Sequence, residues 1–259
     1  MDLHFETLGH GPPLIILHGL FGSLGNWRSM IPRLGEDFKV LAIDQRNHGR
    51  SPHSPEMTYE LMAEDLLEFM GKQKLESAFV LGHSMGGKVA MQLALSHAER
   101  VDRLIVADMA PKAYSTREKR IVEALLALDV SQFQNRTEME VALADSIPDL
   151  AVRRFLLKDL EKDVQGKFHW QMNVRAIFDN YELLTQAVSG TVPFKKPTLF
   201  LRGEKSRYIK PEDIPQIQLL FPGAEVQMLE GAGHWLHVET PEAFLRSVRD
   251  FLLPGKTSG

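Results

Sequence analysis

A serine flanked by glycines interrupts an otherwise apolar stretch, FVLGHSMGGKVA at residues 79–90. The segment GHSMG at 82–86 matches G-x-S-x-G, the pattern in which a serine on a sharp strand-to-helix turn exposes its hydroxyl. Glycines on both sides remove Cβ atoms where strand and helix nearly touch. A short connection that needs only small residues would use the same glycines. The apolar strand pattern before, the helical pattern after and the adjacent Gly87 favour the first alternative, so Ser84 is the predicted nucleophile.

A serine hydroxyl is a weak nucleophile until a base takes its proton, and ten histidines compete for that role. His234 lies in GAGHWLHVETPEAF at 231–244, between the last apolar run and the last helical pattern. Loops of this kind, at the carboxyl ends of parallel strands, face the ligand crevice. His237 is the alternative, but its apolar neighbours indicate packing against the last helix. His18 and His48 lie in glycine-containing turns, where we expect structural roles, so His234 is the predicted base.

Acyl transfer also needs two backbone N–H groups that face the developing negative charge. Met85 follows the nucleophile and is expected to supply one of them. The second is expected from the loop HGLFGSLGNW at 18–27, which follows the apolar run at 14–17. Within this loop we expect the N–H of Leu20 to complete the oxyanion hole. Phe21 is expected to line the substrate pocket.

Short apolar runs rich in β-branched residues alternate with helical patterns along most of the chain. This alternation predicts an α/β fold with a mostly parallel central sheet and helices on both faces. An alternating pattern near the N-terminus predicts an antiparallel edge strand. The expected strands cover residues 3–8, 14–17, 39–43, 78–82, 103–107, 198–202 and 225–229. The expected helices cover about 58–71, 86–98, 212–220 and 240–252.

Residues 111–193 break this rhythm, because they contain helical signals and no convincing strand. We expect them to form an α-helical cap inserted into a discontinuous core domain made of residues 1–110 and 194–254. The terminal residues 255–259 are expected to form a disordered tail. Within the cap, the expected helix starts are Ser115-x-x-Glu118, Thr137-x-x-Glu140, Asp149 and Asn173. The expected apolar face of its last helix consists of Ile177, Tyr181, Leu184 and Val188.

Composition excludes several classes of function. Hydrophobic residues make up 44% and charged residues 25% of the chain, which is ordinary for a globular protein. The net charge of −4, without a basic run, predicts no nucleic-acid partner. The chain has no cysteine, which excludes disulfides and cysteine nucleophiles. His234, His237 and Glu239 lack further ligands nearby in the sequence, so we expect no metal.

The N-terminal segment MDLHFETLGH carries an acid where a basic leader region would be needed, and the nearby apolar run at 14–17 is short. We therefore expect a cytoplasmic protein without a membrane span. The sequence leaves its oligomeric state open between monomer and dimer.

With these residues placed, the chain resembles the α/β-hydrolase fold superfamily over nearly its whole length. The matching blocks, in the family's order, are LIILHGLFGS, VLAIDQRNHGRS, FVLGHSMGG, LFLRGEKS and GAGHWLHVETPEAF. The blocks HGLFGS, DQRNHGRSPHS and GHSMGGKVAM look especially like cofactor-free bacterial esterases that cleave acyl esters and acyl-CoA thioesters, and like their mitochondrial hydrolase relatives. The resemblance implies no cofactor, Ser84 as nucleophile, His234 as base, and Leu20 and Met85 as the oxyanion hole.

The acid departs from the superfamily's commonest pattern, in which an aspartate follows the strand TLFLR in a G-x-x-D turn. Here the turn reads Gly203-Glu204-Lys205-Ser206, with serine in the aspartate position. Asp108 ends the strand that follows the nucleophile, where its carboxylate could reach His234 from another direction, as in the related esterases. Glu204 is the alternative, and Asp108 could instead cap a helix. We expect Asp108 to be the triad acid.

These residues predict a serine esterase that cleaves small to medium acyl esters through an acyl-Ser84 intermediate, with acyl-CoA thioesters as a further substrate class. A perhydrolase, a lactonase or a C–C bond hydrolase would use the same triad, and a receptor-like member would bind a ligand with negligible turnover. Asp44 and Arg46 are expected to hold the loop after their strand through an ion pair and turn hydrogen bonds.

Overall fold

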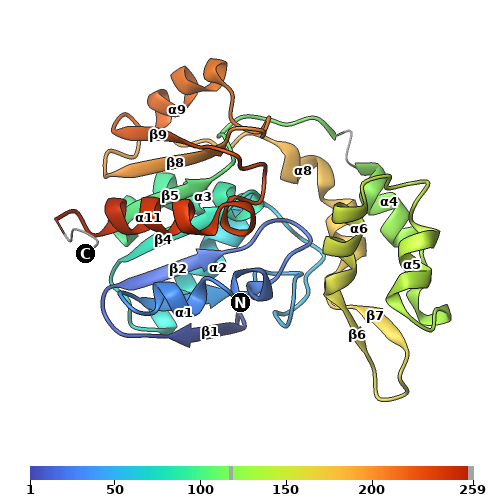
Figure 1. The fold of residues 1–259 in the computed structure, drawn as a ribbon. Helices are drawn as coiled ribbons and strands as arrows, with labels where there is room; N and C mark the ends of the chain where they lie inside the picture. Colours follow the sequence, from blue (N-terminus) through green and yellow to red (C-terminus); the bar gives the residue numbers. More distant parts are fainter. Residues whose placement is uncertain (117–118, 256–259) are drawn as a thin grey trace.

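The computed structural model describes residues 1–116 and 119–255, so Glu118 and the predicted tail residues 256–259 lie outside the described part. A seven-stranded sheet lies at its centre, in the order β1-β3-β2-β4-β5-β8-β9 (Figure 1). Strand β1 is antiparallel to β3, and the other neighbours are parallel. The strands are β1 Phe5–Leu8, β2 Pro13–Leu17, β3 Lys39–Ile43, β4 Ala78–His83, β5 Val101–Ala107, β8 Thr198–Gly203 and β9 Ala224–Leu229. Each predicted strand is confirmed to within two residues at either end.

Helices cover both faces of this sheet, because alternate strand residues face opposite sides. In β2, Ile15 and Leu17 join the cluster packed by α2 and α3, whereas Leu14 and Ile16 join the cluster packed by α1 and α11. Figure 1 shows α11 and α1 in front of the sheet and α2 and α3 behind it. The helices of the core are α1 Ile31–Leu34, α2 Tyr59–Lys72, α3 Met85–Ser96, α9 Ile214–Leu220, α10 Leu236–Glu239 and α11 Pro241–Leu252.

Three strands end side by side at one edge of the sheet. Strand β2 pairs with β4 in a register that places Leu17 beside Gly82, and β4 pairs with β5 so that His83 lies beside Ala107. The chain order reverses at β2 and β4, and ligands of open α/β sheets bind at such a reversal, beyond the carboxyl ends of the strands. The loops that leave β2, β4 and β5 therefore meet at one place.

Between β5 and β8 the chain leaves the sheet and forms an insertion beyond these strand ends (Figure 1). Its elements are α4 Lys119–Ala127, α5 Arg136–Ala142, α6 Leu150–Leu156, β6 Leu160–Lys162, β7 Phe168–Trp170, α7 Val174–Asp179 and α8 Tyr181–Thr185. The expectation that this segment has no strand is wrong, because β6 and β7 pair as a hairpin. The Asp163 carboxylate accepts from two turn amides, and Gly166 has φ +78°. Strands of three residues are too short to show an alternating pattern.

The helix starts of the insertion agree with the sequence in part. Asp149 and Asn173 cap α6 and α7 by accepting hydrogen bonds from first-turn amides. The expected start at Thr137 is wrong, because the cap of α5 lies two residues earlier, at Asn135, which accepts from the amide of Glu138. The predicted Ser115-x-x-Glu118 box cannot be compared, since Glu118 lies outside the described residues.

The last expected helix of the insertion is broken into two. Helix α7 ends at Asp179 and α8 begins at Tyr181. Asn180 stands between them because its side chain bonds the core: its amide donates to the carbonyl of Pro55 at 2.7 Å, and its oxygen accepts from the amide of Met57 at 3.2 Å. The apolar residues predicted for one face are nevertheless all buried.

Two core side chains hold the segment that returns from the insertion. The Tyr59 hydroxyl donates to the carbonyl of Leu184, and the ammonium of Lys88 donates to the carbonyl of Gln186. Burial lowers the pKa of Lys88 to about 7. The protonated form of Lys88 is favoured by the nearby carbonyls at the negative end of α8.

Candidate active site

Ser84 lies at the junction of β4 and α3 in a strained conformation, with φ 53° and ψ −119°. Such a geometry typically costs about 1–3 kcal/mol in a residue other than glycine, and it persists only where the surroundings enforce it. A Cβ placed on Gly82 would lie 2.1 Å from the carbonyl oxygen of Gly86, and one placed on Gly86 would lie 2.6 Å from that of His18. The two glycines therefore allow strand, helix and neighbouring loop to approach closely enough to form the turn.

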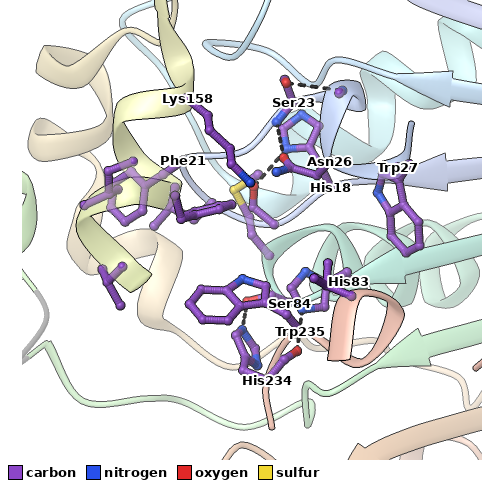
Figure 2. Close-up of a pocket in the computed structure, with 18 of the residues that line it drawn as sticks. His18, Phe21, Ser23, Asn26, Trp27, His83, Ser84, Lys158, His234 and Trp235 are labelled. Atoms are coloured by element: carbon purple, nitrogen blue, oxygen red, sulfur yellow. Dashed lines mark hydrogen bonds between the residues drawn. The ribbon is translucent and has the colours of Figure 1, made fainter. Parts of the chain in front are cut away.

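The structure brings Ser84, His234 and Asp108 into one hydrogen-bonded chain. The Nε2 atom of His234 lies 3.1 Å from the Ser84 hydroxyl oxygen, and its Nδ1 atom lies 2.7 Å from a carboxylate oxygen of Asp108. Since the carboxylate can only accept, Nδ1–H donates to Asp108, and the lone pair of Nε2 faces Ser84. Figure 2 shows the imidazole directed at the serine, beside Trp235. Glu204 does not reach His234, and its carboxylate accepts instead from the amide of Gly231 at 2.8 Å.

The fully buried carboxylate of Asp108 is satisfied from three sides. Besides His234, it accepts from the amide of Gly203 at 3.2 Å and from the hydroxyl of Ser206. Ser206 occupies the position at which the family's commonest pattern has aspartate, and here it donates to an acid that comes from β5. A buried ionised carboxylate without such donors would be costly. Asp108 itself has φ 53°, a second strained residue at the same edge.

Sequence reasoning missed the groups that hold the His234 loop. The Glu239 carboxylate accepts from the amides of Gly233 and Trp235, at 2.7 and 3.0 Å. It thus clamps the backbone on both sides of His234. The ring of Tyr208 stacks on the imidazole, with centroids 4.0 Å apart and an interplanar angle of 19°. In the sequence, the spacing of Glu239 after His234 suggests only a metal pattern, and no sequence signal marks Tyr208.

His83, which precedes the nucleophile, also supports this loop. Its Nε2 atom lies 2.8 Å from the carbonyl oxygen of His234, so the ring donates to the backbone of the residue that carries the base. Figure 2 shows this bond as a dashed line beside the bond between His234 and Ser84. Burial lowers the pKa of His83 well below its usual value, so the ring is neutral at pH 7.

The loop after β2 passes close to the nucleophile, and hydrogen bonds hold the peptide that contains the N–H of Leu20. The carbonyl of Gly19 accepts from Nδ1 of His18 at 2.8 Å and from the amide of Gly22 at 3.1 Å. In a trans peptide the carbonyl and the following N–H point in opposite directions, so the N–H of Leu20 faces away from these donors. A Cβ on Gly19 would lie 3.2 Å from the Cβ of Ser84, which shows how closely the loop passes the serine.

Met85 supplies a second amide at the same place. It is the first residue of α3, where N–H groups have no partner within the helix. The amide of Gly86 donates to the carbonyl of His18 at 3.1 Å and ties this helix start to the loop after β2. Within residues 1–116 and 119–255, no protein acceptor bonds the amides of Leu20 and Met85.

The loop after β3 is held differently from the expectation. Asp44 and Arg46 do not form the predicted ion pair. The Asp44 carboxylate accepts from the amides of Leu24 and Arg50, at 2.7 and 3.0 Å, whereas Arg46 pairs with Asp65 of α2 at 2.6 Å. Asp44 thereby ties the loop after β3 to the loop after β2. The partner of Arg46 lies in the next long helix, too far along the chain for a local sequence pattern to predict the pair.

A cavity of about 1970 Å³ opens over Ser84, between the core and the insertion. Phe21, Leu20 and Met85 line it. Figure 2 shows Lys158 of the insertion extending into the same space. Apolar and aromatic side chains from both parts form much of its wall: Tyr59, Met109, Tyr114, Ile121, Val152, Phe155, Leu156, Leu157, Tyr181, Leu184 and Trp235.

The residues that the structure describes contain no group of three or more His, Cys, Asp or Glu side chains arranged to hold a metal ion. Across the same residues, no helix combines the length and the apolar character that a membrane crossing requires.

Histidines packed at this edge of the sheet are neutral because they are buried. Burial lowers the pKa of His18 to about 4 and the pKa values of His48 and His237 to about 3. An unfolded histidine takes up its proton near pH 6.5, so between about pH 6.5 and 4 the unfolded state binds more protons than the folded state. Burial raises the pKa of the Asp159 carboxyl to about 7, so this group has the opposite effect on how stability changes with pH. It is a single group, whereas several histidines act in the first direction.

We therefore expect the free energy of unfolding to fall as the pH is lowered from about 6.5 toward 4. Each buried histidine contributes at most about 1.4 kcal/mol per pH unit. Urea unfolding at a series of pH values measures this slope. His237→Phe offers a matched test, because His237 stacks on Trp27 at 4.2 Å and a phenyl ring keeps that packing. The slope should be shallower in this variant, and an unchanged slope would show that His237 titrates normally in the folded protein.

Comparison with known proteins gives a consistent result. The family described as alpha/beta hydrolase fold matches residues 12–241. The sn-1-specific diacylglycerol lipase ABHD11 of Danio rerio is 38% identical over 96% of this chain and 81% of its own length. Esterase YbfF of Escherichia coli (strain K12) is 35% identical over 93% of this chain and 92% of its own.

Among solved structures, a marine microorganism esterase superposes with a TM-score of 0.93. It is 44% identical, and the match covers 96% of this chain and 99% of that one. The family match, the relatives and the solved structure thus indicate the same fold. These relatives and the solved structure are named lipases or esterases, which cleave ester bonds.

Proposed function

Since this chain belongs to the alpha/beta hydrolase fold family and is a hydrolase of ester bonds, we propose that it works through an acyl-Ser84 intermediate. The observation that carries the proposal is the chain of hydrogen bonds from Ser84 through His234 to Asp108, with separations of 3.1 and 2.7 Å. Nucleophile, base and orienting acid within hydrogen-bond reach are the arrangement that acyl transfer needs.

In the first half-reaction, Nε2 of His234 takes the hydroxyl proton as the Ser84 oxygen attacks the carbonyl carbon of the ester. The negative charge that develops on the carbonyl oxygen is stabilised by the amides of Leu20 and Met85. Asp108 holds the imidazole in the tautomer that accepts this proton and stabilises the imidazolium that forms. His234 then returns the proton to the departing alcohol, and the acyl group remains on Ser84.

In the second half-reaction, water occupies the place of the alcohol. His234 takes a proton from it, the resulting hydroxide adds to the acyl carbon, and the same two amides stabilise the second oxyanion. Collapse of this intermediate breaks the bond to Ser84, which recovers its proton from His234. The products are a carboxylic acid and the free enzyme.

We further propose that residues 111–193 act as a cap that selects the acyl group. Apolar side chains of the insertion, among them Ile121, Leu156 and Leu184, line the cavity above Ser84. Burial of apolar surface favours an uncharged acyl chain, and Phe21 would contact it from the core. A small to medium acyl ester is the proposed substrate, and the lipase name of the relative from Danio rerio is compatible with a glyceride.

The proposal extends to acyl-CoA thioesters as a second substrate class. Thioester cleavage asks for the same attack at a carbonyl carbon and the same oxyanion donors. Arg28 and Lys158, which line the same cavity, would favour a phosphorylated leaving group. If acyl-CoA thioesters are not cleaved, this extension is wrong, and the esterase proposal is unaffected.

The experiment is a panel of p-nitrophenyl esters and acyl-CoA thioesters of increasing chain length, measured beside labelling by a fluorophosphonate. We expect labelling of the wild-type protein and ester hydrolysis with a clear optimum of chain length. Labelling without hydrolysis of either class would redirect the assignment to a lactonase, a perhydrolase or a C–C bond hydrolase. Absence of both would contradict the esterase proposal and favour a ligand-binding protein.

A further inference from the structure

Phe21 adopts a backbone conformation that its side chain disfavours. Its φ is 64°, in the left-handed region that glycine, asparagine and aspartate tolerate best. It directly follows Leu20, and the peptide between them carries the carbonyl of Leu20 and the N–H of Phe21, whereas the N–H of Leu20 belongs to the preceding peptide. Whatever holds the N–H of Phe21 therefore fixes the peptide that follows Leu20, and so limits how far the backbone of Leu20 can turn.

The amide of Phe21 donates to the Nε2 atom of His48 at 3.2 Å. His48 comes from the loop after β3, is fully buried, and is absent from the residues that line the cavity. Its other ring nitrogen, Nδ1, lies 3.0 Å from the carbonyl oxygen of Arg46. The ring thus bridges two backbone groups on different loops.

These two partners fix the proton on the ring. The amide of Phe21 can only donate, so Nε2 of His48 must carry the lone pair, and the carbonyl of Arg46 can only accept, so Nδ1 must carry the proton. A protonated ring would set one N–H against another. Burial lowers the pKa of His48 to about 3 and so keeps the accepting form at neutral pH.

We propose that His48 is a positioning residue of the oxyanion hole: by accepting the N–H of Phe21, it holds the loop that directs the N–H of Leu20 at Ser84. The proposal rests on the function proposed above. His48 acts through Phe21 and does not touch the substrate. Without its acceptor, the amide of Phe21 would lie unpaired in a partly buried loop, and the left-handed conformation would lose its support.

Support from His48 acts beside that from His18. His18 holds the carbonyl of Gly19, in the same peptide as the N–H of Leu20, and His48 holds the amide of Phe21, in the next peptide. The two rings lie 5.1 Å apart, tilted by 56°. The backbone around Leu20 is therefore fixed on both sides by neutral imidazoles.

Two substitutions separate the hydrogen bonds of the ring. In His48→Asn, the side-chain amide matches the position of Nδ1 and can still donate to Arg46, but nothing accepts from Phe21. In His48→Gln, the longer side chain places an oxygen near the position of Nε2, where it can accept from Phe21. The two variants therefore differ in whether the side chain can accept a hydrogen bond from the amide of Phe21, which is the bond that the proposal requires.

For His48→Asn we expect kcat on a p-nitrophenyl ester to fall about 10- to 100-fold, below the 10²–10³ typical of deleting an oxyanion donor, because the Leu20 amide is displaced and not removed. KM should stay near the wild-type value. The affinity for a trifluoromethyl ketone, whose adduct carries the oxyanion, should fall by about the same factor as kcat. His48→Gln should retain most of the activity.

If His48 had only a structural role, both variants would have a lower melting temperature but an unchanged kcat and an unchanged affinity for the ketone. That result would overturn the proposal. Inactive wild-type protein would instead contradict the proposed function. If His48→Asn does not fold, ¹⁵N NMR of the wild type decides: we expect His48 in the Nδ1–H tautomer with a hydrogen bond from the amide of Phe21. An Nε2–H tautomer is incompatible with the proposal.

Discussion

Ser84→Ala is expected to lower kcat for ester hydrolysis by about 10⁶, the loss typical of removing a triad nucleophile. Alanine leaves the cavity and the amides of Leu20 and Met85 in place, so the ester can still bind and be polarised. It removes the oxygen that attacks the carbonyl carbon and forms the acyl intermediate. KM should therefore change little, while labelling by a fluorophosphonate should disappear. Steady-state kinetics and labelling of the purified variant measure both effects.

The matched control is Ser96→Ala. Ser96 ends the same helix, α3, and its exposed hydroxyl accepts a hydrogen bond from the side chain of Gln92, away from the cavity. This variant should keep the wild-type kcat and the full labelling. Both variants should unfold at similar temperatures. Residual labelling of Ser84→Ala, or an equal loss in both variants, would show that the reactive serine lies elsewhere.

The parts of the site that could be predicted from the sequence are those whose geometry depends on residues only a few positions away. The serine turn requires glycines within two residues of Ser84, because a Cβ on Gly82 or Gly86 would meet backbone oxygens at 2.1 and 2.6 Å. His234 follows a strand in a loop with two glycines. Asp108 directly follows strand β5, an acid in an apolar environment that demands partners. In each case the signal lies within a few residues of the functional group.

The parts that were not predictable depend on partners distant in the chain. Ser206 donates to Asp108 across 98 positions, and the ring of Tyr208 meets His234 only because β8 and β9 are neighbours in the sheet. Arg46 was paired with the wrong acid for the same reason, since its partner Asp65 approaches only when α2 packs on the sheet. Periodicity predicts which elements form, but it contains no information about which side chains meet.

The insertion shows the same limit on a smaller scale. Asp149 and Asn173 were predicted as helix caps because a cap is a local interaction. The break at Asn180 was missed because its cause is a pair of hydrogen bonds to residues 55 and 57 of the core. A continuous apolar stripe predicts one helix there until a tertiary contact divides it.

Asp108→Asn is expected to lower kcat by about 10⁴, as in a serine protease whose triad aspartate is replaced. The asparagine amide can donate to Nδ1 of His234 and so favours the tautomer whose Nε2–H faces Ser84 and cannot take its proton. The negative charge that stabilises the imidazolium is lost as well. Because the change is nearly isosteric, KM should remain close to the wild-type value. Kinetics with the ester of optimal chain length measure the loss.

Glu204→Gln is the control that tests the alternative acid. The Glu204 carboxylate bonds the amide of Gly231, and its loss should change kcat little. The double variant Asp108→Asn, Ser206→Asp is the sharper test, since the hydroxyl of Ser206 already meets the oxygen of Asp108 that bonds His234. A carboxylate placed there should recover part of the activity by restoring the acceptor for Nδ1–H. If Glu204→Gln caused the larger loss, Asp108 would be a structural residue and the acid would come from β8.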